Sequence, residues 1–154
     1  IPKQILENNG VEIKTISSEK GTAVGVSGGE AEVDILVQDL NPADFDAVLF
    51  IGGQGAIKYI DDGNYHRLVR ETIENNKILG AICIAPTILA KAGVLKGKKA
   101  TVWSDQMDKS AVKILKENGA DYRDEPVVVD GKIITANGPL AAKEFAETLI
   151  EMLK

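Results

Sequence analysis

The sequence predicts an α/β fold in which helices cover both faces of a mainly parallel sheet. Two continuous apolar runs, residues 46–51 and 77–82, are typical of strands that are buried on both faces. Segments with apolar residues at helical spacing alternate with these runs, which favours parallel strands joined by helices. The 154 residues are 44% hydrophobic and 27% charged, which suits one domain around one core.

The elements are expected in a simple order along the chain. A first helix, with Pro2 in its first turn, should end at the Asn-Asn-Gly of residues 8–10. Strands are expected at residues 11–17, 22–26, 31–35, 46–51, 77–82, 100–103 and 127–134; the second and third form a hairpin around residues 27–29, and the last is a hairpin through Asp130-Gly131. Helices are expected at residues 64–75, 86–92, 110–118 and 140–153, and residues 41–44 form a turn or a short helical start.

The charge and residue counts argue against several kinds of partner and site. With 18 Lys and Arg against 23 Asp and Glu, the net charge is −5, which argues against a nucleic-acid partner. One cysteine and one histidine give no disulfide and no metal cluster, and we expect no metal and no cofactor. No apolar run approaches the roughly 20 residues that cross a bilayer, so we expect no membrane partner and a cytoplasmic location.

Cys83 lies between the apolar strand that ends at residue 82 and the helix that begins at Pro86. Such a sharp strand-to-helix turn lifts a nucleophile above the sheet, beside free backbone N–H groups. The helix N-terminus favours the thiolate, so the thiol pKa is predicted to fall below its ordinary value. The alternative is that Cys83 is a buried and inert small residue.

Gly52-Gly53 follows the strand that ends at residue 51, and so it also lies at a carboxyl strand end. Glycine there lets backbone N–H groups approach a ligand oxygen. Together with the N–H of Ile84, this turn predicts an oxyanion hole beside Cys83. A simple tight turn is the alternative interpretation.

Four ordered stretches resemble the DJ-1/PfpI superfamily: residues 1–11, 41–53, 81–101 and 127–139, the third containing Cys83. This resemblance implies a flavodoxin-like three-layer α/β/α sandwich, a homodimer or higher homo-oligomer, and a reactive elbow cysteine. It covers residues 1–154 as one domain. The family's central first strand and a glutamate before the first helix would precede Ile1. Without that strand the sheet would leave unpaired backbone groups, at about 1–3 kcal/mol each, so we expect the native protein to have it.

Several positions depart from the family pattern. The histidine that follows the nucleophile in PfpI-type members is Ile84 here, and the histidine of DJ-1-type members matches Trp103. The acidic partner of the protease-type triad falls near Ile57. His66, on an expected helix, is interpreted as a solvent-facing residue. Trp103 is either a pocket wall or part of the core.

The polar and turn residues near these positions have simpler interpretations. Asp105 and Asp108 follow the Trp103 strand, so they either point to the pocket or cap the following helix, and the cap is the interpretation we favour. Pro139, with Asn137 and Gly138, caps the last helix or lines the site. Tyr59, Asp61 and Asp62 are expected in a solvated loop.

Three functional classes follow from these features. The first is a glyoxalase- or deglycase-like enzyme of stress defence, in which Cys83 attacks a small reactive carbonyl compound and the absent glutamate serves as the acid–base group. The second is a PfpI-type intracellular cysteine peptidase or amidase, which the absence of both family histidines weakens. The third is a non-catalytic redox sensor or chaperone-like protein in which Cys83 is oxidised. The expected ligand is therefore a small-molecule substrate or a peptide.

Overall fold

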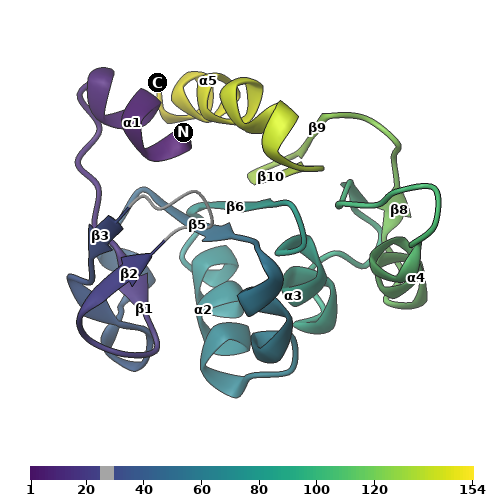
Figure 1. Cartoon of the computed structure of the whole chain (residues 1–154), viewed down its shortest axis with the longest axis horizontal. Helices are drawn as coiled ribbons and strands as arrows, with labels where there is room; N and C mark the ends of the chain where they lie inside the picture. The colour runs from purple at the N-terminus through teal and green to yellow at the C-terminus, as the bar shows by residue number, and fades with distance from the viewer. Residues whose placement is uncertain (25–29) are drawn as a thin grey trace.

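The computed structural model describes residues 1–24 and 30–154 (Figure 1). Its main sheet has four strands in the order β5 (Ala47–Ile51), β6 (Ile78–Ile82), β10 (Ile133–Ala136) and β9 (Val127–Asp130). β5 and β10 both run parallel to β6, and β9 pairs with β10 in the antiparallel sense. The mainly parallel sheet predicted from the sequence is thereby confirmed.

Helices cover the two faces of this sheet and create two hydrophobic cores. Figure 1 shows α1 (Pro2–Asn8) and α5 (Ala142–Leu153) on one face and α2 (Gly63–Glu74) and α3 (Pro86–Lys91) on the other. Leu6 and Phe145 pack with Ile134 in the first core, and Leu68 and Leu89 belong to the second. α4 (Ser110–Glu117) extends the second layer beside α3. Among the described residues, no helix is long and apolar enough to span a bilayer.

Three two-stranded pairs surround the main sheet. β1 (Ile16–Ser17) runs parallel to β4 (Ile35–Leu36), and β7 (Lys99–Ala100) runs parallel to β8 (Asp121–Tyr122). β2 (Thr22–Val24) and β3 (Glu30–Glu32) are antiparallel, as the predicted hairpin requires. The proposed turn at residues 27–29 lies outside the described residues. The strand expected at residues 11–17 shrinks to β1, and β8 was not expected.

Short 3-10 helices lie between the longer elements, and η4 takes up the first two residues of the helix expected at residues 140–153. They are η1 (Val37–Asp39), η2 (Pro42–Asp44), η3 (Gln54–Tyr59) and η4 (Pro139–Ala141). η2 confirms the expected helical start, because the Asn41 side chain accepts a hydrogen bond from the Ala43 N–H at 3.1 Å. η3 and η4 follow β5 and β10 at their carboxyl ends, so both lie at the edge of the sheet where β6 delivers Cys83.

Candidate active site

Cys83 is the first residue after β6, and its backbone has φ of +65°. Residues with a Cβ rarely adopt this left-handed conformation, which costs about 1–2 kcal/mol. Two hydrogen bonds hold it in place: the Cys83 N–H donates to Ala136 O at 3.0 Å, and Cys83 O accepts from the Trp103 N–H at 2.8 Å. A strained turn fixed from both sides is the geometry of a nucleophile elbow.

Gly52 packs directly against this turn. Its N–H donates to Ile82 O at 3.1 Å, so this N–H is not free to bind a ligand. A Cβ at this position would lie 2.6 Å from Ile82 O and 2.7 Å from the backbone nitrogens of Ile84 and Ala85. Only glycine therefore lets the end of β5 approach the elbow so closely, and Gly52 is a packing residue and not an oxyanion donor.

Gly53 and Ile84 supply the N–H groups that remain near the elbow. Neither N–H donates to a backbone acceptor within residues 1–24 and 30–154. Gly53 is extended, with φ of −177°, and the space around its Cα is open. The backbone of Ile84, next in the chain, lowers the pKa of the Cys83 thiol and so favours the thiolate. These two donors are the ones available for an oxyanion.

Burial raises the pKa of the Cys83 thiol, and the hydrogen bond from the Ile84 N–H offsets only part of this effect. No charged side chain of the described residues contributes to the shift. The pKa predicted from the sequence therefore has the wrong direction. The half-buried thiol loses hydration, and no cation stands beside it to stabilise the thiolate.

Trp103 lies beside the elbow. Its backbone N–H donates to Cys83 O, and the Cδ1 atom of its indole ring lies 3.7 Å from where a Cβ of Gly138 would be. The side chain is half-buried, so it belongs neither to the fully buried core nor to the open surface. Pro139 follows Gly138 at the start of η4 and is exposed. The loop after β10 thus adjoins Trp103.

Other candidate residues do not converge on Cys83. His66 is half-buried, not solvent-facing as predicted, and its Nε2 atom lies 2.7 Å from Ile60 O. Ile57, at the position of the acidic partner in the family pattern, has an exposed side chain. Asp105 Oδ1 accepts from the backbone N–H groups of Met107 and Asp108, and thereby shapes the loop before α4.

Asp108, and the residues from the end of η3 to the start of α2, also have structural roles. Asp108 Oδ1 accepts from Ser110 N at 2.9 Å and Oγ at 2.6 Å. The N-cap residue of α4 is nevertheless Lys109, so neither Asp105 nor Asp108 occupies the predicted cap position. Asp62 caps α2 through Asn64 N at 2.8 Å, and Asp61 faces Lys91. Tyr59 is not a solvated loop residue, because its hydroxyl lies 2.7 Å from Ser18 Oγ.

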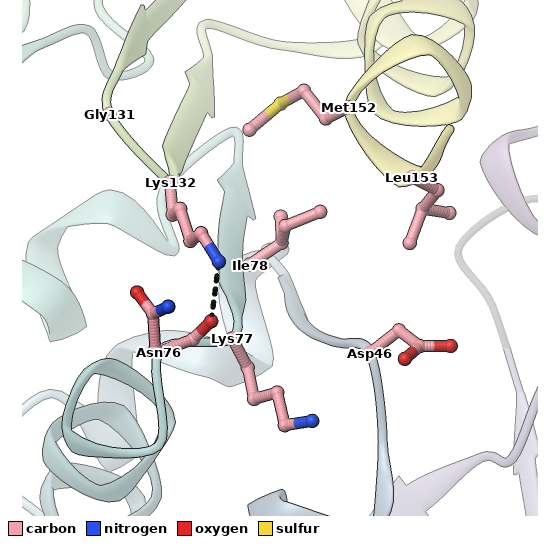
Figure 2. Close-up of a pocket in the computed structure, with 8 residues that line it drawn as sticks. All are labelled: Asp46, Asn76, Lys77, Ile78, Gly131, Lys132, Met152 and Leu153. Carbon is pink, nitrogen blue, oxygen red and sulfur yellow. Dashed lines mark hydrogen bonds between the residues drawn. The ribbon is translucent and has the colours of Figure 1, made fainter.

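A hollow of about 430 Å³ lies at the opposite edge of the sheet, near the amino ends of the strands (Figure 2). It is lined by Asp46, Asn76, Lys77, Ile78, Gly131, Lys132, Met152 and Leu153. Lys132 Nζ donates to Asn76 O at 2.7 Å across one side of it. No motif in the sequence marks this hollow, so it was not predicted. Within the described residues, no three His, Cys, Asp or Glu side chains cluster as metal ligands would.

Comparisons with known proteins agree with this geometry. The family model described as DJ-1/PfpI family matches residues 1–152. An uncharacterized protein of Methanocaldococcus jannaschii is 40% identical over 154 residues, covering 99% of this chain and 72% of that protein. The crystal structure of a ThiJ/PfpI domain protein from Brachyspira murdochii is 34% identical with a TM-score of 0.93, covering 99% of this chain and 85% of that chain.

Relatives with functional names describe different reactions. Deglycase PfpI of Pyrococcus furiosus is 29% identical over 153 residues, covering 99% of this chain and 89% of that protein. Other relatives are named putative cysteine protease, in Bacillus subtilis at 31% identity, and glutathione-independent glyoxalase, in Caenorhabditis elegans at 27%. The reaction therefore has to be argued from the residues of this chain.

Proposed function

Because the chain belongs to the DJ-1/PfpI family, we propose that Cys83 is the nucleophile of an enzyme that acts on small reactive carbonyl compounds. The observation that carries this proposal is the strained Cys83 elbow, beside which the N–H groups of Gly53 and Ile84 donate to no backbone acceptor of the described residues. Two relatives named deglycase and glyoxalase support the same class.

The addition step needs only groups that the elbow provides. The Cys83 sulfur forms a bond to the aldehyde carbon, the carbonyl π electrons move to oxygen, and the thiol proton is transferred to that oxygen. The product is a thiohemiacetal. N–H groups of Gly53 and Ile84 would stabilise the developing negative charge, and one such donor is typically worth about 10²- to 10³-fold in rate.

Completion of a glyoxalase reaction needs a second proton transfer. A base moves the former aldehyde C–H proton to the neighbouring ketone carbon, and the hydroxyl proton passes to the ketone oxygen, which leaves a thioester. Water then hydrolyses the thioester and releases a 2-hydroxy acid and the free thiol. The family resemblance assigns this base to a glutamate before the first helix.

Carbonyl addition suits this site better than peptide hydrolysis does. An amide has to expel an amine, which requires a proton donor, whereas an aldehyde has no leaving group at the addition step. His66 bonds to Ile60 O, and the one hydrogen bond that shifts the pKa of the Cys83 thiol comes from the Ile84 backbone. Among the described residues, therefore, no side chain stands beside Cys83 that could protonate the amine leaving group of a cysteine protease reaction.

The proposal is tested by following methylglyoxal loss and lactate formation with the wild-type protein and with Cys83→Ala. We expect turnover by the wild type and none above the buffer rate by Cys83→Ala. A casein or peptide substrate, assayed in parallel, should not be cleaved. Aldehyde turnover that survives Cys83→Ala, or wild-type cleavage of peptides without aldehyde turnover, would contradict the proposal.

A further inference from the structure

Resting on the proposed function, we infer that the Cys83 site prefers uncharged carbonyl compounds that carry an apolar or aromatic group, and that Trp103 is the residue that selects them. The inference starts from the side chains beside the elbow. Trp103 is bonded through its backbone N–H to Cys83 O at 2.8 Å and is half-buried. The Trp103 Cδ1 atom lies 3.7 Å from where a Cβ of Gly138 would be, and Gly138 comes two residues after Ala136, whose carbonyl accepts from the Cys83 N–H. The indole ring therefore lies against the loop beside the elbow and keeps accessible surface.

The loops on either side of the elbow also carry apolar side chains. Ile51 directly precedes Gly52, which contacts the elbow backbone, and the Ile51 side chain is 61% exposed. Leu140 comes two residues after Gly138, which adjoins Trp103, and Leu140 is fully exposed. Two exposed large aliphatic residues therefore lie at the carboxyl ends of β5 and β10, at the edge of the sheet where β6 delivers Cys83.

Charge around the sulfur points to the same kind of ligand. No charged side chain of the described residues contributes to the shift in the pKa of the Cys83 thiol, and burial is its main cause. A substrate with a carboxylate near its carbonyl group would lose hydration there without gaining a cationic partner. An apolar substituent, in contrast, gains by leaving water and by packing against an aromatic face.

The expected discrimination follows from these contacts. One methylene group in an apolar pocket changes kcat/KM by about 10- to 200-fold. A phenyl ring packed against Trp103 would bury more apolar surface than one methylene group does. We therefore expect phenylglyoxal to exceed methylglyoxal by about tenfold or more in kcat/KM, after each is normalised to its reaction with N-acetylcysteine. Glyoxylate, which carries a carboxylate, should be the poorest substrate.

The test compares formation of mandelate from phenylglyoxal with formation of lactate from methylglyoxal. Measurement of the product avoids interference from phenylglyoxal that reacts with arginine. Trp103→Ala should lower mandelate formation by about tenfold and lactate formation by less than about twofold, because methylglyoxal has little to pack on the ring. Trp103→Phe should retain most of the preference. Equal rates for both substrates in the wild type, or an equal loss of both in Trp103→Ala, would overturn the inference while leaving the proposed function intact.

If neither aldehyde is turned over, the proposed function is contradicted. The preference for apolar ligands can still be tested by a second measurement. Cys83 is the sole cysteine, so thiol labelling reports on this site alone. The ratio of labelling rates for N-phenylmaleimide and N-ethylmaleimide, normalised to a free thiol, should exceed one and should fall toward one in Trp103→Ala. Iodoacetate should label more slowly than iodoacetamide by the same normalisation. A ratio of one in the wild type rejects the apolar preference.

Discussion

Replacement of Cys83 by glycine should leave the protein more stable than replacement by alanine. The φ of +65° at this position costs a residue with a Cβ about 1–2 kcal/mol, and glycine avoids that cost. Glycine also gains freedom in the unfolded chain, which disfavours folding by about 0.4–1 kcal/mol. The difference favours Cys83→Gly by about 0.5–1 kcal/mol. Both variants lack the thiol, so loss of the sulfur cancels in the comparison.

Two neighbouring asparagines provide matched controls. Asn76 has φ of +57°, whereas Asn75 has φ of −85°, and both are exposed. The glycine variant should be at least as stable as the alanine variant at residue 76, and less stable than it at residue 75. The chain therefore has an exposed position with positive φ directly beside an exposed position with negative φ.

The free energy of unfolding is measured by urea denaturation of all six variants. For a domain of this size, 1 kcal/mol corresponds to about 2–4 °C in Tm, so thermal melts provide a second reading. If the asparagine pairs behave as expected and Cys83→Ala is as stable as Cys83→Gly, the elbow is not strained in solution. The argument for a strained nucleophile would then be refuted.

Three further predictions concern the same region. Gly52→Ala would place a methyl group 2.6–2.7 Å from backbone atoms of the elbow, so it should lower Tm and the rate of Cys83 alkylation; Gly53→Ala enters open space and should change both little. Because burial raises the pKa of the Cys83 thiol, the pH profile of alkylation should have its midpoint above the ordinary value of about 8.5, and a midpoint below 8 would contradict the structure. The same shift stabilises the fold below the ordinary thiol pKa and is lost as pH rises above it, which urea melts from pH 7 to 10 can follow. Thr101→Val should raise the free energy of unfolding by about 1 kcal/mol, because the buried Thr101 hydroxyl has no partner in the described structure, whereas Thr72→Val should lower it, because that hydroxyl donates to a backbone oxygen at 2.6 Å.

Elements with a strong apolar pattern were predicted closely. β5 and β6 match the runs at residues 46–51 and 77–82 to within one residue, because strands covered on both faces need continuous apolar side chains. α2 was expected at residues 64–75 and lies at Gly63–Glu74. The amphipathic pattern of its sequence is sufficient to define such a helix.

Elements held by distant partners were not predicted. β8 has only two residues, Asp121 and Tyr122, and exists because it pairs with β7 more than twenty positions earlier. η3 and η4 follow glycine turns, where local propensity is weak and the backbone is set by neighbouring elements. Patterns within a short window carry no information about such pairings.

The position of Cys83 at a strand-to-helix turn was predicted, and the environment of its sulfur was not. The strand-to-helix junction at Cys83 is evident in the sequence, but the hydrogen bond from Trp103 joins residues twenty positions apart. How far a thiol is buried also depends on the packing of several elements. The direction of the pKa shift therefore required the structure, as did the role of Gly52 as a packing residue.

The elbow and its thiol together indicate how rate acceleration would have to arise. A free thiol with a pKa of about 8.5 is only about 3% ionised at pH 7, and a raised pKa makes the Cys83 thiolate scarcer still. The chain nevertheless holds Cys83 in a costly backbone conformation. This strained conformation does not increase the fraction of thiolate. Its contribution to catalysis would be to position the sulfur beside N–H donors that stabilise the reacting oxygen. Catalysis should therefore depend on the N–H groups of Gly53 and Ile84 more than on an activated thiolate. It should favour electrophiles, such as aldehydes, whose oxygen can take up the thiol proton during addition.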